Sequence, residues 1–147
     1  MEKFDICVHF LLSKALQSVN QVSKSKLSSF GVTPVQYALL RLLWKKDGQF
    51  GYELAKKLLL DSATITGIID RLEQNGFIER QVDLYDRRNK VVFLTEKGKS
   101  IEASLCQKMN EMNNEVMSNF DDEEIQLFKK MLFNMGITNK NKEGKLK

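Results

Sequence analysis

The stretch from Asp61 to Thr95 constrains the fold more than any other part of the chain. Its first half predicts a short amphipathic helix, because four apolar residues spaced at about 100° per residue share one narrow face: Ile65, Ile68, Ile69 and Leu72. Asn75-Gly76 ends this helix, since glycine adopts the left-handed conformation that a helix end favours. Residues 77–82 and 91–94 then alternate as two strands. A short helix followed directly by a hairpin with a basic tip predicts a winged helix-turn-helix that reads DNA.

The face of the helix opposite the apolar one is small and polar near its start. The major groove admits a helix only when its leading side chains allow close approach, and hydroxyl and methyl groups there contact phosphates or bases. The predicted DNA contacts in this helix are Ser62, Ala63, Thr64, Thr66, Gly67 and Arg71. Ser62 also has an interpretation as the helix cap, a role open to Asp61 as well.

The hairpin tip carries Arg87, Arg88 and Lys90. These cations fit phosphate contact or a narrow minor groove, where negative potential is concentrated. The competing interpretation is a solvated hairpin tip, and Lys56 and Lys57 are interpreted as a solvated helix face. Asp70 is an acid on a face that meets a polyanion. We therefore hypothesise that Asp70 pairs with Arg87 or Arg88 and holds helix and wing in register.

Helical periodicity on both sides of this stretch predicts a mostly α-helical fold. A long first helix runs from Phe4 to about Ser28, and Thr33-Pro34-Val35-Gln36 opens the next helix with a capping box. After the hairpin, Thr95 caps a helix whose apolar residues are spaced almost as heptads: Ile101, Leu105, Met109, Met112 and Val116. The acids at 121–124 start a last helix. We expect dimerisation helices at 1–30 and 100–137, the DNA-binding domain at 31–99 and a flexible basic tail at 138–147.

Composition excludes several classes of protein. The net charge of +4 and the sequence pI near 9.0 are compatible with nucleic acid as a partner. Cys7 and Cys106, far apart and accompanied by a single histidine, argue against a zinc site or a disulfide scaffold and for a reducing cytoplasm. No phosphate loop or nucleophile arrangement indicates an enzyme, so we expect no catalysis, metal or cofactor. No apolar run is long enough for a membrane span, and the N-terminus does not resemble a secretory signal.

The order and spacing of three short motifs resemble the MarR family of bacterial transcription regulators over roughly residues 31–98. These motifs are Asp70-Arg71-Leu72-Glu73 with Gly76, then Asp86-Arg87-Arg88, then Leu94-Thr95-Glu96-Lys97-Gly98. Leu84 departs from the family, which often has a proline there, and we expect this to loosen the wing without changing the fold.

The resemblance implies a two-fold dimer with intertwined terminal helices that reads a pseudo-palindromic operator. The heptad-like seam agrees, because a lone helix exposing it would leave an apolar patch that monomers usually avoid. Many family members are repressors released by small phenolic ligands bound in a crevice beside the dimer stem. The candidate lining residues are His9, Phe10, Tyr37 and Trp44, although for each of them taken singly a place in the core or an interface is the commoner case.

Two alternatives remain open from the sequence. Cys7, near the start of the first helix with Tyr37 in the second, resembles the organic-hydroperoxide sensors of the family, which makes a thiol-based peroxide-sensing repressor possible. A buried, inert cysteine is the commoner case, and Cys106 is interpreted as packing. The other alternative is a winged-helix module that binds proteins. The basic wing and the small helix face favour DNA.

Overall fold

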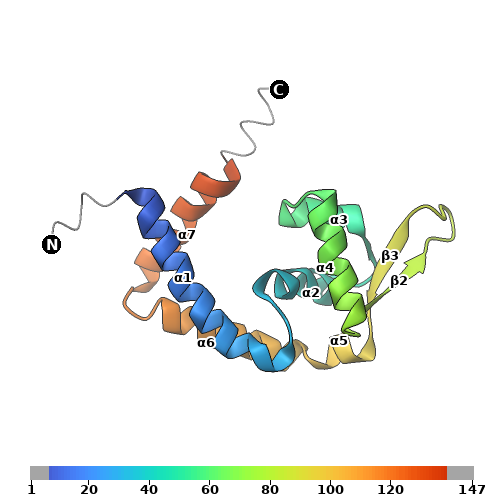
Figure 1. The fold of residues 1–147 in the computed structure, drawn as a ribbon, viewed down its shortest axis with the longest axis horizontal. Helices are drawn as coiled ribbons and strands as arrows, with labels where there is room; N and C mark the ends of the chain where they lie inside the picture. The colour runs from blue at the N-terminus through green and yellow to red at the C-terminus, as the bar shows by residue number, and fades with distance from the viewer. Residues whose placement is uncertain (1–6, 139–147) are drawn as a thin grey trace. The chain divides into compact units, whose positions relative to one another are not determined.

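The computed structural model describes residues 7–138, which form seven α-helices and one small sheet. Contacts divide the chain into two compact units that meet between Met112 and Asn113, and each is described by itself. The elements of Figure 1 are α1 (Val8–Leu27), the short turn η1 (Ser28–Phe30), α2 (Pro34–Lys45), β1 (Gln49–Phe50), α3 (Gly51–Leu58), α4 (Ser62–Gln74), β2 (Ile78–Val82), β3 (Lys90–Leu94), α5 (Glu96–Ser100), α6 (Glu102–Val116), α7 (Asp122–Phe133) and the π-helical turn η2 (Asn134–Thr138).

Helix α2 is the centre of the first unit. The predicted capping box is present, because the Gln36 amide donates to Thr33 Oγ1 at 3.3 Å and the Thr33 amide donates to Gln36 Oε1 at 3.1 Å. Three leucines of α2 have no exposed surface: Leu39, Leu40 and Leu43. Burial on several faces explains why this helix is almost wholly apolar.

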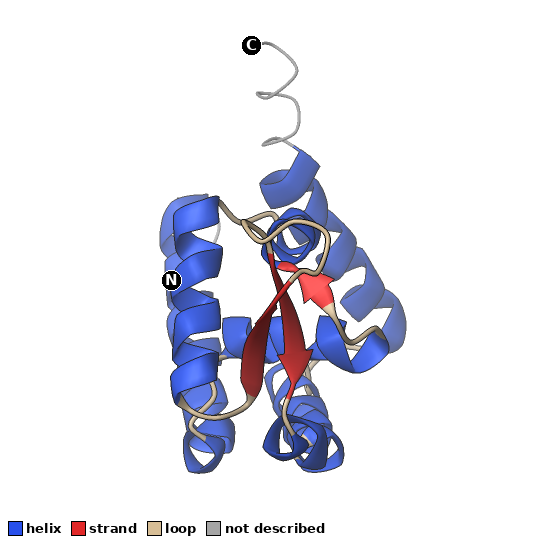
Figure 2. Cartoon of the chain, turned by 90° about the vertical axis from the view of Figure 1, so that its right-hand side faces the viewer, coloured by secondary structure: helices blue, strands red, loops and turns tan. Residues whose placement is uncertain are grey.

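The sheet is antiparallel in the order β1-β3-β2, and the long hairpin of β2 and β3 forms the wing (Figure 2). In its register Ile78 lies opposite Leu94 and Val82 opposite Lys90. The sequence did not reveal β1, which has only two residues. Gln49 of β1 is buried and fully satisfied, since its amide nitrogen donates to the Leu42 and Lys46 carbonyls and its oxygen accepts from Lys57 Nζ at 2.6 Å.

A contact from α2 fixes the base of the wing. The indole nitrogen of Trp44 donates to the Gly98 carbonyl at 2.9 Å. In a continuous helix that carbonyl would accept from the amide of Glu102. The single helix that the sequence predicts after Thr95 is instead divided into α5 and α6 at Ile101, whose φ and ψ are −90° and −5°.

The heptad-like seam of α6 is covered largely within the chain, contrary to the expectation that it needs a second copy. Leu105, Met109 and Met112 are buried in the first unit. The C-terminal end of α1 contacts α6, because Lys26 forms an ion pair with Glu111 at 3.6 Å, and the neighbouring Leu27 is buried. The exposed apolar face of the first unit lies instead on the N-terminal half of α1, at Val8, Phe10, Leu11, Leu12 and Leu16.

The second unit contains α7, which begins with a capping box between Asp121 and Glu124 as the acids predicted. One face of α7 is apolar and exposed, at Leu127, Phe128, Met131 and Leu132. No described helix combines the length and the apolar character that crossing a membrane requires. The mostly α-helical winged fold is confirmed, whereas residues 1–6 and nearly all of the predicted basic tail lie outside the described residues.

Candidate nucleic-acid interface

The start of α4 is set by Asp61, whose carboxylate accepts from the Thr64 amide at 2.7 Å. Asp61 is therefore the cap, and Ser62 occupies the first helical position with its hydroxyl not needed for capping. The apolar face is buried as its spacing predicts, with exposed fractions of 8% or less at Ile65, Ile68, Ile69 and Leu72. This burial fixes which face of α4 points outward.

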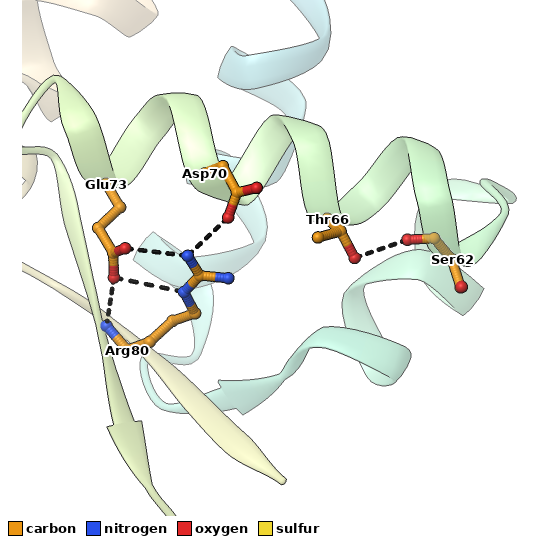
Figure 3. Close-up of polar contacts among 5 residues, drawn as sticks. All are labelled: Ser62, Thr66, Asp70, Glu73 and Arg80. Atoms are coloured by element: carbon orange, nitrogen blue, oxygen red, sulfur yellow. Dashed lines mark hydrogen bonds and ion pairs between the residues drawn. The ribbon is translucent and has the colours of Figure 1, made fainter. Parts of the chain in front are cut away.

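All six DNA contacts predicted in α4 are exposed on that outward face. Thr66 Oγ1 donates to the Ser62 carbonyl at 2.7 Å, which leaves the oxygen lone pairs and the methyl group of Thr66 for a ligand (Figure 3). A Cβ atom built on Gly67 would meet nothing within 4 Å, so the surface there is open.

Two grooves flank the exposed ridge of α4. The larger, of about 570 Å³, lies on the side of the wing and is lined by Ser62 and Thr66 together with Tyr52, Lys56, Arg80, Arg88, Asn89 and Lys90 among others. The smaller, of about 400 Å³, lies towards the start of α2 and is lined by Ala63, Thr64, Gly67 and Arg71 together with Thr33, Val35, Gln36 and Ile68. The structure thus gathers the predicted contacts of α4 along two neighbouring grooves.

The acid on this helix has a different partner from the one the sequence suggested. Asp70 Oδ1 lies 2.6 Å from Arg80 Nη2, so the expected pairing of Asp70 with Arg87 or Arg88 is wrong. The reason is that Arg87 and Arg88 lie in the loop beyond the strands, whereas Arg80 lies in β2, beside α4 (Figure 3). The link between helix and wing is therefore made at a strand.

Glu73 completes this cluster one helical turn further on. Its carboxylate accepts from Arg80 Nη2 at 2.9 Å, from Nε at 3.3 Å and from the Arg80 amide at 3.2 Å (Figure 3). The hydrogen bonds from Arg80 lower the pKa of Glu73 against the opposing effect of burial. The bonds to Glu73, and then those to Asp70, raise the pKa of Arg80. With two carboxylates on one guanidinium, Arg80 holds the wing in place and is neutralised as a phosphate ligand.

The cations at the tip of the wing are exposed to solvent. Arg87, Arg88 and Lys90 are exposed, and the Arg88 side chain keeps 92% of its surface accessible although its Nε lies 3.3 Å from Asp86. An ion pair this exposed contributes little to stability, so Arg88 can exchange Asp86 for another anion at small cost.

The two adjacent lysines of α3 have different environments, which the sequence alone does not reveal. Lys57 Nζ donates to the buried Gln49 side chain, a structural role. Lys56 lines the larger groove beside Ser62. Both lysines are exposed, as the interpretation of a solvated face requires, and the contact of Lys57 with Gln49 of β1 is what distinguishes them.

The proposed effector residues are only partly brought together. Tyr37 and Trp44 meet edge to face, 6.0 Å between ring centres, and line a cavity of about 270 Å³ with Arg41, Lys45, Glu102, Cys106 and Asn110. The Tyr37 hydroxyl lies 3.8 Å from Cys106 Sγ, and burial, followed by this contact, raises the pKa of Tyr37. His9 and Phe10 are exposed on α1 and do not line this cavity.

Cys7 is an exposed free thiol directly before α1, and the tyrosine that the peroxide-sensing interpretation associates with it contacts Cys106 instead. No contact within the described part of the chain supports a redox role for Cys7, which stays a prediction. Among residues 7–138 no group of three or more histidine, cysteine or acidic side chains is placed to bind a metal ion.

Comparisons with known proteins agree with this geometry. Residues 32–90 match the model of the MarR family. The chain is 29% identical to the HTH-type transcriptional regulator MhqR of Bacillus subtilis over 140 residues, which cover 95% of this chain and 97% of that protein. It is 34% identical to the HTH-type transcriptional repressor YetL of the same organism over 119 residues, covering 79% and 71% of the two chains. The crystal structure of overoxidized AbfR bound to DNA superposes with a TM-score of 0.70 at 26% identity, covering 87% of this chain and 89% of that one.

Proposed function

The chain belongs to the MarR family of transcription regulators, and we propose that it represses transcription as a two-fold dimer that reads a pseudo-palindromic operator. One observation carries the proposal: the small, polar face of α4 is exposed between two grooves and is braced against a basic wing by Asp70, Glu73 and Arg80. With DNA as its ligand, we expect the protein in the cytoplasm.

In this proposal the start of α4 enters the major groove and meets base edges with Ser62, Thr66 and Gly67. The larger groove holds one DNA strand, because cations of α3 and of the wing line it: Lys56, Arg88 and Lys90. The Arg80 guanidinium lies in the same groove with its charge already balanced. Phosphate contacts set the register of the protein, and base contacts set the sequence that it prefers.

The dimer is supported by apolar faces that the single chain leaves exposed. They lie on the N-terminal half of α1 and along α7, and they include Leu16, Phe128 and Met131 with exposed fractions of 60%, 41% and 52%. Contiguous apolar surface of this kind marks an interface with another chain. A two-fold dimer then places its half-sites about 10 base pairs apart, centre to centre.

The direct test is selection of duplexes from a random pool, followed by fluorescence anisotropy with the enriched duplex over a range of salt concentrations. Affinity should fall steeply with salt, and Arg88→Ala should reduce the slope of log K against log salt by about 0.9 if the arginine neutralises one phosphate. Glu79→Ala is the matched wing control, and its slope should not fall. Failure to enrich any duplex, with no salt-dependent binding, would instead favour the protein-binding alternative.

We further propose that the cavity beside Trp44 binds the effector. Its volume of about 270 Å³ suits a single-ring molecule, and Arg41 and Lys45 at its edge suit a ligand with a carboxylate. Trp44 is the only tryptophan, so binding can be followed by intrinsic fluorescence. Salicylate as the probe should quench Trp44 and release the selected duplex, and Arg41→Ala should weaken both effects. Release of DNA without any change in Trp44 fluorescence would place the effector elsewhere.

The route from this cavity to the wing is short. Trp44 donates to the Gly98 carbonyl, and a Cβ on Gly98 would lie within 2.1 Å of the Phe77 carbonyl oxygen, so α5 packs directly against the residue that precedes β2. A ligand that displaces the indole therefore acts on the base of the wing. Release of DNA follows if the wing and α4 lose their register.

A further inference from the structure

Leu84 and Tyr85 in the loop of the wing are exposed almost completely, at 94% and 97%. Most other large apolar side chains with high exposure lie on α1 and α7, where a second chain would cover them. Leu84 and Tyr85 gain nothing from the fold, since burial of apolar surface is what stabilises such residues. Their function must therefore lie outside the isolated chain.

The loop that carries them is a turn held by hydrogen bonds. The Asn89 amide donates to the Asp86 carbonyl at 3.1 Å, and the Asp86 carboxylate accepts from the Arg88 amide at 3.0 Å and from Asn89 Nδ2 at 3.3 Å. The Asp83 amide closes the loop by donating to the Asn89 carbonyl at 3.0 Å. These bonds fix residues 86–89 and project the two apolar side chains beyond the last pair of the hairpin, Val82 and Lys90.

The charges around the pair identify its partner. Arg87, Arg88 and Lys90 are exposed beside it, and of the two nearby acids Asp86 is engaged by the turn. Asp83, the other acid, is half-buried. An apolar tip surrounded by exposed cations fits a surface whose rims are anionic and whose interior offers carbon-rich walls. The minor groove of DNA is such a surface, with phosphates along its edges and deoxyribose rings along its walls.

We propose that Leu84 and Tyr85 enter the minor groove beside each half-site and pack against its sugar walls, while Arg87 and Arg88 neutralise the adjacent phosphates. Proteins that bind this groove commonly use apolar side chains in this way. The inference rests on the proposed DNA binding and adds a readout that the cations alone do not supply. The groove floor distinguishes A·T from G·C pairs, because guanine carries an amino group there. An apolar tip is excluded by that group, so the flank that meets the wing should be rich in A·T.

The first test separates apolar contact from charge, using the duplex that the wild-type protein enriches from a random pool. Leu84→Ala with Tyr85→Ala should weaken binding by about 100-fold, about tenfold for each apolar side chain that is truncated. The salt slope should stay as in wild type, since no counterion-releasing group is removed. Arg87→Ala is the matched variant in the same loop, and it should lower the slope. Tyr85→Phe keeps the ring and should bind like wild type.

The second test changes only the floor of the groove. Replacing A·T by G·C in the flank should weaken wild-type binding. Inosine·C in the same position lacks the minor-groove amino group but keeps the major-groove pattern of G·C, so it should restore affinity. The double alanine variant should respond equally to all three flanks. Because both side chains are fully exposed, its thermal unfolding should match wild type.

The outcomes distinguish the two proposals. Wild-type protein that enriches no duplex overturns the proposed function itself. Wild-type protein that binds DNA while the double variant binds equally well overturns the inference alone. A lower salt slope in the double variant also overturns it, because the weaker binding would then come from displaced arginines, and docking of the tip onto another protein would become the better explanation of its exposure.

Discussion

Arg80 Nη2 lies 2.6 Å from Asp70 Oδ1, and this contact joins α4, the helix proposed to bind DNA, to the first strand of the wing. The same guanidinium contacts Glu73, one turn along α4, so a single side chain links the two elements that we propose bind DNA together. Both acids lie on the part of the molecule that we propose faces DNA, where negative charge by itself opposes binding.

Asp70→Ala is therefore expected to weaken binding of the selected duplex by about three- to tenfold, although it removes a negative charge, because the register of α4 and wing loosens. Asp70 is 45% exposed, so the loss of unfolding free energy should stay near 0.5–1 kcal/mol. Anisotropy titration measures the first effect and urea denaturation the second. Glu79→Ala removes an exposed acid from β2, the strand that carries Arg80, and should bind as well as wild type or better. Tighter binding by Asp70→Ala would contradict this role.

Glu73 makes a pH-dependent contribution to stability. Its pKa in the folded protein is lowered below the ordinary value of 4.5, chiefly by hydrogen bonds from Arg80. A lowered folded pKa means that the contribution is present above the unfolded pKa and is lost as pH falls through the folded pKa. At neutral pH the free energy of unfolding of wild type should exceed that of Glu73→Gln by on the order of 1 kcal/mol. In acid the two free energies should become equal. Urea denaturation at several pH values measures both free energies. A difference that persists in acid would mean that Glu73 stabilises the fold by packing and not by its charge.

The elements carried by local signals were predictable from the sequence. Apolar spacing located α4, a capping box located the start of α2, a run of acids located the start of α7, and Gly76, with φ of +81°, ended α4 as expected. The predictions that were wrong concern which of several similar side chains or surfaces, distant in the sequence, contact each other in the fold. Three arginines of the wing could pair with Asp70, and it is the packing of β2 beside α4 that selects Arg80. The burial of the α6 seam within the first unit likewise depends on tertiary packing, which periodicity does not specify.

Gly67→Ala should separate stability from binding. Glycine inside a helix costs about 0.5–1 kcal/mol relative to alanine, and a Cβ at this position meets nothing within 4 Å, so the variant should unfold at a higher urea concentration. The added methyl group lies on the face that approaches DNA, so affinity for the selected duplex should fall. Gly98→Ala is the contrasting variant, since its Cβ would lie 2.1 Å from the Phe77 carbonyl oxygen and should destabilise the fold. Unchanged affinity for Gly67→Ala would show that α4 stands further from the bases than proposed.

Met131→Asp should disrupt the dimer while leaving the fold of the chain intact. Met131 is 52% exposed on the apolar face of α7, so the carboxylate is tolerated in the isolated chain but must be desolvated in an interface. Lys129→Asp, on an exposed position of the same helix, provides the control. Sedimentation should show monomers for the first variant and dimers for the second, with circular dichroism of both like that of wild type. A dimeric Met131→Asp protein would place the interface away from α7.

The contact between Tyr37 and Cys106 can be tested through the titration of the phenol. Burial is the largest cause that raises the pKa of Tyr37 above 10.0, and the contact with Cys106 is the next, whereas Arg41 lowers it. Cys106→Ala should therefore shift the pKa of Tyr37 part of the way back, and Arg41→Gln should shift it further up, as followed by NMR of the Tyr37 ring. Because the folded pKa is raised, the stabilisation is complete below the unfolded pKa and disappears as pH rises through the folded value. Stability above pH 10.0 should accordingly fall less steeply in Cys106→Ala than in wild type. Identical titration of Tyr37 in wild type and Cys106→Ala would mean that burial alone sets its pKa and that the two side chains do not interact in solution.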